Sequence, residues 1–67
     1  MEGILKALNE TFETLTIDTK AIQCSHALFA NITASGRFEV GDLVAYDLKP
    51  DGGLQSLVLA HRKGLAS

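Results

Sequence analysis

The sequence contains no tryptophan, one cysteine, one proline and only four aromatic residues, namely three phenylalanines and one tyrosine. Cys24 cannot form a disulfide within the chain, and no group of Cys and His residues has the spacing of a zinc site. No apolar run approaches the roughly 20 residues that span a membrane. We therefore predict no metal ligands, no cofactor and no membrane association.

Positive charge is also scarce, because six lysines and arginines stand against eight acids and the net charge is −2. Phosphate contacts dominate nucleic-acid affinity, so a binder normally has a basic face. The bulk charge gives no sign of one, although charge can be sorted by face. No signal-peptide pattern precedes the domain, so we predict a cytoplasmic location.

The size and apolar content indicate one small domain, since 67 residues with 46% apolar side chains supply a single core near the lower limit for unassisted folding. We assign residues 1–61 to this domain and residues 62–67 to a short tail. Cys24 and His26 are too close along the chain to give the geometry of a nucleophile and its base. We therefore predict no catalytic residues and no enzymatic activity.

Two patterns compete over residues 2–15. Ile4, Leu8 and Phe12 recur at helical spacing, which is typical of an amphipathic helix. Against that, residues 14–18 alternate strictly between polar and apolar side chains, and β-branched threonines are dense here. From these residues alone the evidence is nearly balanced between helix and strand.

The rest of the chain favours short strands separated by turns. Alternation predicts strands over residues 27–32, 43–48 and 54–61, while residues 20–25 fit either a strand extension or a loop. Residues 49–53, Lys-Pro-Asp-Gly-Gly, form the clearest turn signal. Five short strands at this spacing predict an all-β, five-stranded antiparallel barrel.

Residues 3–17 resemble the first two strands of a bacterial cold-shock domain. That family opens with G-x-V-K-W-F-N and continues into K-G-F-G-F-I; Gly3, Lys6, Asn9 and Ile17 match it without a gap. Residues 28–35 and 36–42 resemble the third strand and the G-[FY]-K-x-L-x-x-G loop that follows. The resemblance implies an oligonucleotide-binding (OB) type of barrel and favours strands, with a turn at residues 9–11, over the helix.

The resemblance also implies a nucleic-acid-binding face that has lost most of its aromatic residues. Positions of a tryptophan and three phenylalanines in the family are here Ala7, Leu8, Thr14 and Thr16. We predict that Leu15 and Ile17 point inward. The remaining candidates for contact with bases or phosphates are Lys6, Phe12, Phe29, Asn31, Arg37 and Phe38.

Two functions follow from this face. The first is weak, sequence-tolerant binding of single-stranded RNA or DNA, with Phe29 and Phe38 stacking on bases. The second is a protein-interaction or homodimer surface built from Phe12, Phe29, Ile32 and Phe38. Core packing of Phe12 and Phe38, and solvated surface roles for Lys6 and Arg37, remain open alternatives.

Overall fold

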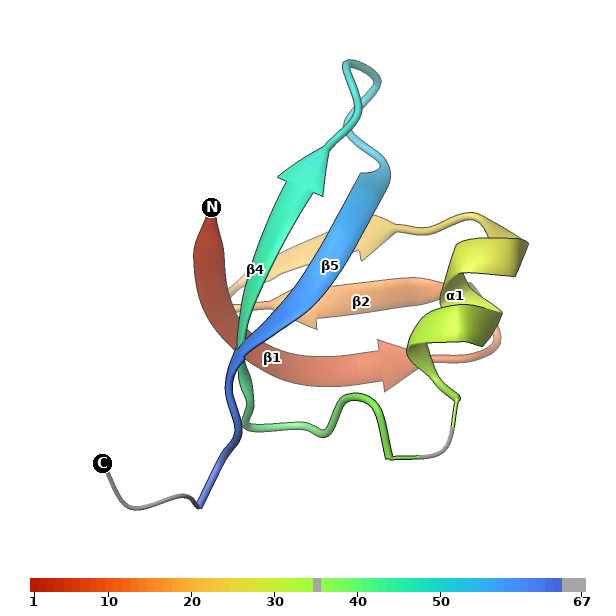
Figure 1. Cartoon of the computed structure of the whole chain (residues 1–67). Coiled ribbons are helices and arrows are strands. Elements are labelled where there is room, and N and C mark those ends of the chain that lie inside the picture. Colours follow the sequence, from red (N-terminus) through yellow and green to blue (C-terminus); the bar gives the residue numbers. More distant parts are fainter. Residues whose placement is uncertain (35, 65–67) are drawn as a thin grey trace.

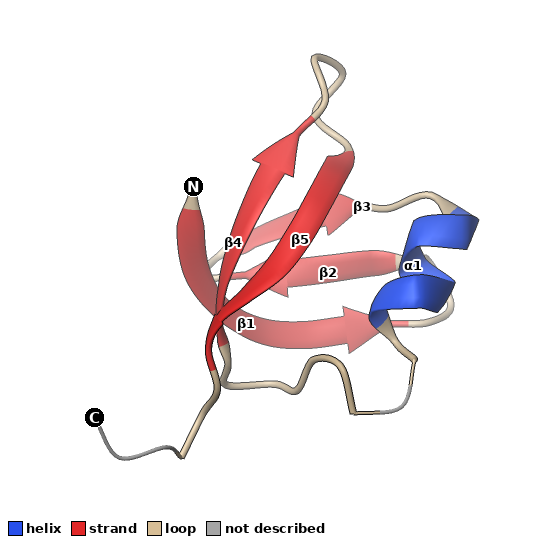
Figure 2. Cartoon of the chain, viewed as in Figure 1, coloured by secondary structure: helices blue, strands red, loops and turns tan. Residues whose placement is uncertain are grey.

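A five-stranded antiparallel sheet makes up most of the molecule (Figures 1 and 2). The structure, a computed structural model, describes residues 1–34 and 36–64. The strand order is β3-β2-β1-β4-β5, and the sheet is open at β3 and β5. The strands are β1 (Glu2–Asn9), β2 (Thr14–Ile17), β3 (Lys20–Gln23), β4 (Leu43–Leu48) and β5 (Leu54–His61). This arrangement confirms the all-β fold class and is compatible with a small barrel.

β1 joins two halves of the sheet by bending, as Figure 1 shows. Its first residues, from Glu2 to Ile4, pair with β4, whereas the stretch from Leu5 to Asn9 pairs with β2. The register shifts between Leu5 and Ala7, so Lys6 is an extra residue in a β-bulge. A bulge bends a strand and increases its twist, which lets a single strand serve both halves of the sheet.

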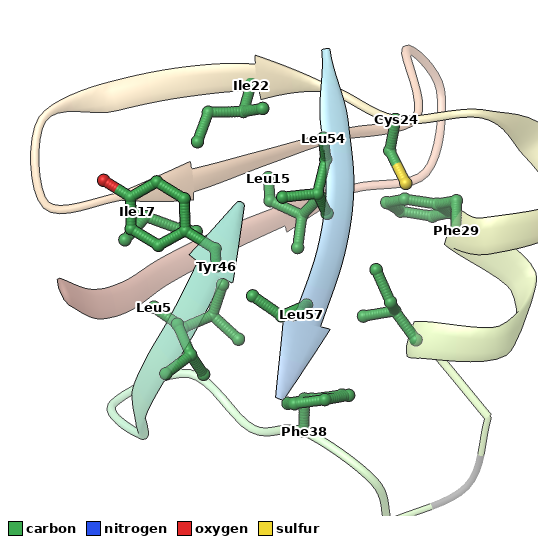
Figure 3. Close-up of a cluster of buried hydrophobic side chains, with 12 residues drawn as sticks. Leu5, Leu15, Ile17, Ile22, Cys24, Phe29, Phe38, Tyr46, Leu54 and Leu57 are labelled. Carbon is green, nitrogen blue, oxygen red and sulfur yellow. The ribbon is translucent and has the colours of Figure 1, made fainter. Parts of the chain in front are cut away.

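The core lies between these halves and consists of twelve buried apolar residues (Figure 3). Leu15 and Ile17 have no exposed surface, which confirms the predicted inward orientation of β2. Val44 and Tyr46 of β4 and Leu57 of β5 complete the facing side. The helical alternative for residues 2–15 is wrong. Residues 2–9 and 14–17 are strands, and alternate side chains of these strands point into the core.

The predicted strand over residues 27–32 is wrong, because this segment forms the helix α1 (His26–Ile32). The third strand is β3, in the segment where strand and loop had both remained open. Ser25 explains the start of α1: its Oγ accepts a hydrogen bond from the Leu28 N–H at 3.3 Å, which caps the helix. Phe29 and Ile32 are three residues apart, so the helix places both on its buried side.

Gly3, shared with the cold-shock motif, is required by a close crossing of β1 and the β2–β3 turn. A Cβ atom at this position would lie 2.5 Å from Asp18 Oδ2 and 2.6 Å from Ile17 Cγ2. Asp18 holds the crossing, since its Oδ1 accepts a hydrogen bond from Ile4 N–H at 3.0 Å. The match at Gly3 thus has a steric reason in this fold.

The remaining predicted elements agree with the structure, apart from a shift of one turn. Residues 43–48 and 54–61 are strands as predicted, and a turn follows β1 at residues 10–13 rather than at residues 9–11. Within the described part of the chain, no helix has the length and apolar character needed to cross a membrane.

Candidate nucleic-acid interface

Six outward residues of β1, β2 and β3 form a surface that carries no charged and no aromatic side chain. Because Leu15, Ile17 and Ile22 point into the core, the alternate residues of these strands point outward. Strand pairing places them in two rows, each crossing all three strands. We call this set the outer face; it comprises Ala7, Asn9, Thr14, Thr16, Ala21 and Gln23.

The β1–β2 turn presents Phe12 at one end of the outer face. The Phe12 side chain is 68% exposed, the highest exposure among the large apolar residues described. Two outer-face amides hold its backbone: Asn9 Oδ1 accepts from the Phe12 N–H at 3.1 Å, and Gln23 Nε2 donates to the Phe12 carbonyl at 2.9 Å. The ring is therefore carried on an anchored turn, which lowers the entropy lost when it binds a partner.

The β4–β5 turn approaches the same end of the outer face. A Cβ atom on Gly53 would lie 3.6 Å from the Gln23 carbonyl oxygen and 3.9 Å from Lys49 Cδ. Lys49 also lies close enough to Cys24 for its charge to oppose the rise in the pKa of that thiol, which burial and the charge of Glu13 cause. Gln23 is thus the point where both turns meet.

Three lysines in or next to the strands of the sheet have no carboxylate partner among the described residues. Lys6 sits in the β1 bulge, Lys20 begins β3, and Lys49 follows β4. Among residues 1–34 and 36–64, no ion pair involves any of the three. They are therefore free to neutralise phosphate.

The other three cations of the described residues, Arg37, Arg62 and Lys63, contact protein groups. Arg62 Nη1 lies 2.8 Å from Glu39 Oε2, and Lys63 Nζ lies 3.4 Å from Glu39 Oε1. Arg37 Nη1 hydrogen-bonds to Asn31 Oδ1, and the guanidinium lies 5.6 Å from the Phe38 ring centroid. These groups tie the chain together on the α1 side.

Asp42 is the centre of this second region and has no exposed surface. Its carboxylate accepts hydrogen bonds from Lys63 N–H at 2.8 Å and Glu39 N–H at 2.9 Å, and Arg62 Nε lies 3.6 Å away. Burial alone would raise the pKa of Asp42, but these hydrogen bonds and the charges of Arg62 and Lys63 outweigh it and lower the pKa. Residues 62 and 63, assigned to a tail, thus contact the domain; residues 65–67 lie outside the described residues.

The structure separates the predicted site residues. Phe29 and Phe38 are only 5% and 9% exposed, so neither ring lies on a binding face as predicted, and the alternative of core packing holds for Phe38 (Figure 3). The cause is α1, which turns Phe29 toward the sheet and carries the following segment across the core. Lys6 and Phe12 border the outer face, whereas Asn31 and Arg37 pair with each other on the α1 side.

Sequence reasoning missed Gln23, Lys20 and Lys49. Residues 20–25 fit an extension of the second strand or a loop, whereas residues 20–23 form a separate strand that pairs antiparallel with β2 and places Gln23 beside Thr14. The lysines had no signal of their own, because a single lysine in a turn or at a strand end is ordinary on a protein surface. Their shared location depends on strand order, which the residues alone do not define.

A shallow hollow of about 230 Å³ lies between the β1–β2 turn and α1. Its lining is Glu10, Glu13, His26, Phe29, Ala30 and Thr33. His26 Nδ1 contacts Glu13 Oε2, which joins the turn to the start of α1. We call this feature the α1 hollow. Within the described residues, no group of three or more His, Cys, Asp or Glu side chains is arranged to hold a metal ion.

No protein-family profile, curated protein or solved structure matches this chain. The resemblance to the cold-shock domain therefore depends on the residues that carry it, and membership of that family stays a prediction.

Proposed function

We propose that this chain is a cold-shock-like domain that binds single-stranded RNA or DNA weakly, with little sequence preference, on the outer face. The observation that carries the proposal is that two turns converge at one end of the outer face, and that Lys6, Lys20 and Lys49 near these strands have no ion pair among the described residues. In OB-type barrels, the face of strands 2 and 3 and the loops 1–2 and 4–5 hold oligonucleotides. The predicted cytoplasmic location stays part of this proposal.

The finer architecture we propose is a partly open OB-type barrel. The strand order β3-β2-β1-β4-β5 leaves β3 and β5 as the two strands that closure would bring together. Their approach begins at Gly53, just before β5, and Gln23, at the end of β3. A helix between the third and fourth strands is compatible with that topology.

The affinity we propose is modest, because one exposed ring, that of Phe12, stacks on a base where the cold-shock family uses several aromatic residues. Phe12 stacks on one base, while Lys6, Lys20 and Lys49 approach the backbone and outer-face hydroxyl and amide groups hydrogen-bond to base edges. One base–aromatic stack contributes about 1–3 kcal/mol. With a net charge of −2 opposing phosphate, we expect a Kd of about 10⁻⁴ M at physiological salt.

Fluorescence anisotropy of labelled heptathymidine and of a mixed RNA heptamer tests this proposal. We expect salt-dependent binding that Phe12→Ala weakens by about tenfold, since 1.4 kcal/mol is a factor of 10. Val58→Ala is the matched control, because Val58 is also exposed (59%) but lies on β5, away from the outer face. No binding at about 1 mM protein, or equal losses in both variants, would contradict the proposal.

Self-association or protein binding is the second candidate, and one observation favours it. β5 is an open edge of the sheet and exposes Val58 and Leu59, at 59% and 38%. The patch predicted from Phe12, Phe29, Ile32 and Phe38 does not form, because the last three are buried. Sedimentation over a range of concentrations tests the β5 candidate: association abolished by Val58→Lys would support it, and a monomer throughout would remove self-association.

A further inference from the structure

The α1 hollow combines apolar residues with two carboxylates. Its floor is apolar, formed by the Phe29 ring and Ala30, while Glu10 and Glu13 stand at its border. Glu13 is partly buried, with 30% of its side chain exposed, whereas the His26 side chain beside it is 87% exposed. The carboxylate of Glu13 is therefore held in the wall, and His26 lies at the mouth.

The available oxygens determine which ligand chemistry fits. His26 contacts Glu13 Oε2, and within residues 1–34 and 36–64 no hydrogen bond reaches Glu13 Oε1 or the Glu10 carboxylate. No lysine or arginine lines the hollow. A phosphate or carboxylate ligand would therefore meet two carboxylates, with His26 already in contact with one of them, whereas a cation would gain charge-assisted hydrogen bonds to the remaining oxygens.

The volume of the hollow and its apolar floor restrict the kind of cation further. A hollow of about 230 Å³ lies below the 300–1,000 Å³ range typical of drug-sized ligands, so it suits a group the size of one side chain. The Phe29 ring and Ala30 offer apolar contact to methylene groups, and long cationic side chains bury such stems while their charged heads stay near water. A bare metal ion would gain nothing from this floor.

We propose that the α1 hollow binds a guanidinium or ammonium group carried on an aliphatic chain. The head lies between Glu10 and Glu13, and the methylene chain lies against Phe29 and Ala30. Such a group belongs either to an arginine or lysine of a partner protein or to a free polyamine. This site shares the β1–β2 turn with Phe12 but has none of the outer-face residues in its lining, and it prefers the opposite charge.

NMR amide chemical shifts of the intact protein at neutral pH provide the test, with N-acetyl-L-arginine methylamide as the probe. The neutral control is N-acetyl-L-citrulline methylamide, which has the same shape but a urea in place of the guanidinium. We expect saturable shifts confined to residues 10–13 and 26–33 at about 10 mM arginine probe, as for one partly exposed ion pair. The citrulline probe should shift them by less than a third as much.

Charge-removing variants locate the binding. Glu13→Gln and Glu10→Gln should each weaken the arginine probe at least about threefold. Glu2→Gln should leave it unchanged, because Glu2 begins β1 and the hollow lies beyond the other end of that strand. Since Glu10 is exposed, its variant keeps the test informative even if Glu13→Gln unfolds. Equal response to both probes, or unchanged affinity in both hollow variants, would overturn the proposal.

The two sources of the cation are compared with the peptide Gly-Gly-Arg-Gly-Gly and with spermidine in the same assay. Tighter binding of the peptide supports a partner protein, and tighter binding of spermidine supports a free polyamine. If neither shifts the amides of the hollow, the proposal fails whatever the outcome for nucleic acid on the outer face.

Discussion

Phe29 and Phe38, on α1 and the segment after it, are buried, whereas Phe12 on the β1–β2 turn exposes 68% of its surface. Charged residues divide in the same way. Arg62 and Lys63 pair with Glu39 around the buried Asp42, while Lys6, Lys20 and Lys49 have no ion pair among the described residues. Aromatic and charged groups in the α1 region thus contact other parts of the protein, whereas Phe12 and the three lysines stay exposed.

The largest expected effect falls in the α1 region. Phe29→Ala should destabilise the fold by about 3–5 kcal/mol, since it leaves a cavity in the core. At about 0.05–0.15 kcal/mol per residue, that is comparable to the total stability of a domain this small. Urea unfolding followed by circular dichroism measures the loss, with Phe12→Ala as the control expected to change stability by under about 0.5 kcal/mol. If Phe29→Ala folds with unchanged stability but binds nucleic acid less tightly, Phe29 is a binding residue and not a core residue.

Asp42 gives the α1 region a pH dependence that the outer face lacks. Its folded-state pKa lies below the unfolded value of about 4, so its contribution is complete above that value and is lost as pH falls through the folded pKa. Asp42→Asn should cost about 1–3 kcal/mol at neutral pH, because two buried N–H groups lose their carboxylate.

Unfolding of both proteins as a function of pH measures this effect. The gap in stability between wild type and Asp42→Asn should narrow as pH falls below about 4. A gap that stays constant through that window would show that the Asp42 charge is not what holds Glu39 and Lys63.

Gln23 tests whether the outer face holds Phe12 in place. Gln23→Ala removes the hydrogen bond to the Phe12 carbonyl and should weaken heptathymidine binding about threefold, with little effect on stability. In a double-mutant cycle, Gln23→Ala should have almost no further effect once Phe12 is alanine. Additive losses in the cycle would mean that Gln23 contacts the ligand itself.

The smallest expected effect concerns the salt dependence of binding. Each lysine that contacts a single strand contributes about −0.7 to the slope of log K against log salt, so three lysines give a slope near −2. Lys49→Gln should reduce that slope by about 0.7, whereas Lys63→Gln should leave it unchanged because Lys63 pairs with Glu39. Equal changes in slope for the two variants would mean that phosphate groups contact Lys63 as well as Lys49.

The sequence predicted the strands whose alternation is strict and whose turns are explicit. β4, β5 and the orientation of Leu15 and Ile17 on β2 belong to this group. It failed at residues 26–32, where a seven-residue segment alternates as a strand does and is also apolar at helical spacing. Ser25 as an N-cap was the local signal that distinguishes the two.

The candidate site was less predictable than the fold. Lys6 and Phe12 were expected to be exposed and both are, but Lys6 lies in the β1 bulge and Phe12 in the β1–β2 turn, so strand alternation explains neither position. The burial of Phe29 and Phe38 depends on α1 crossing the core, and the meeting of Lys49 with Gln23 depends on strand order. Both are tertiary contacts between segments far apart in sequence, which local periodicity does not record.

Amide chemical-shift mapping with unlabelled heptathymidine is the most direct test of the central claim, because it reports where the ligand binds. We expect saturable shifts at Ala7, Thr14, Thr16, Ala21, Gln23 and the Phe12 turn, and none along α1. Shifts confined to α1 and residues 36–42, or no shifts at about 1 mM ligand, would contradict the assignment of nucleic-acid binding to the outer face.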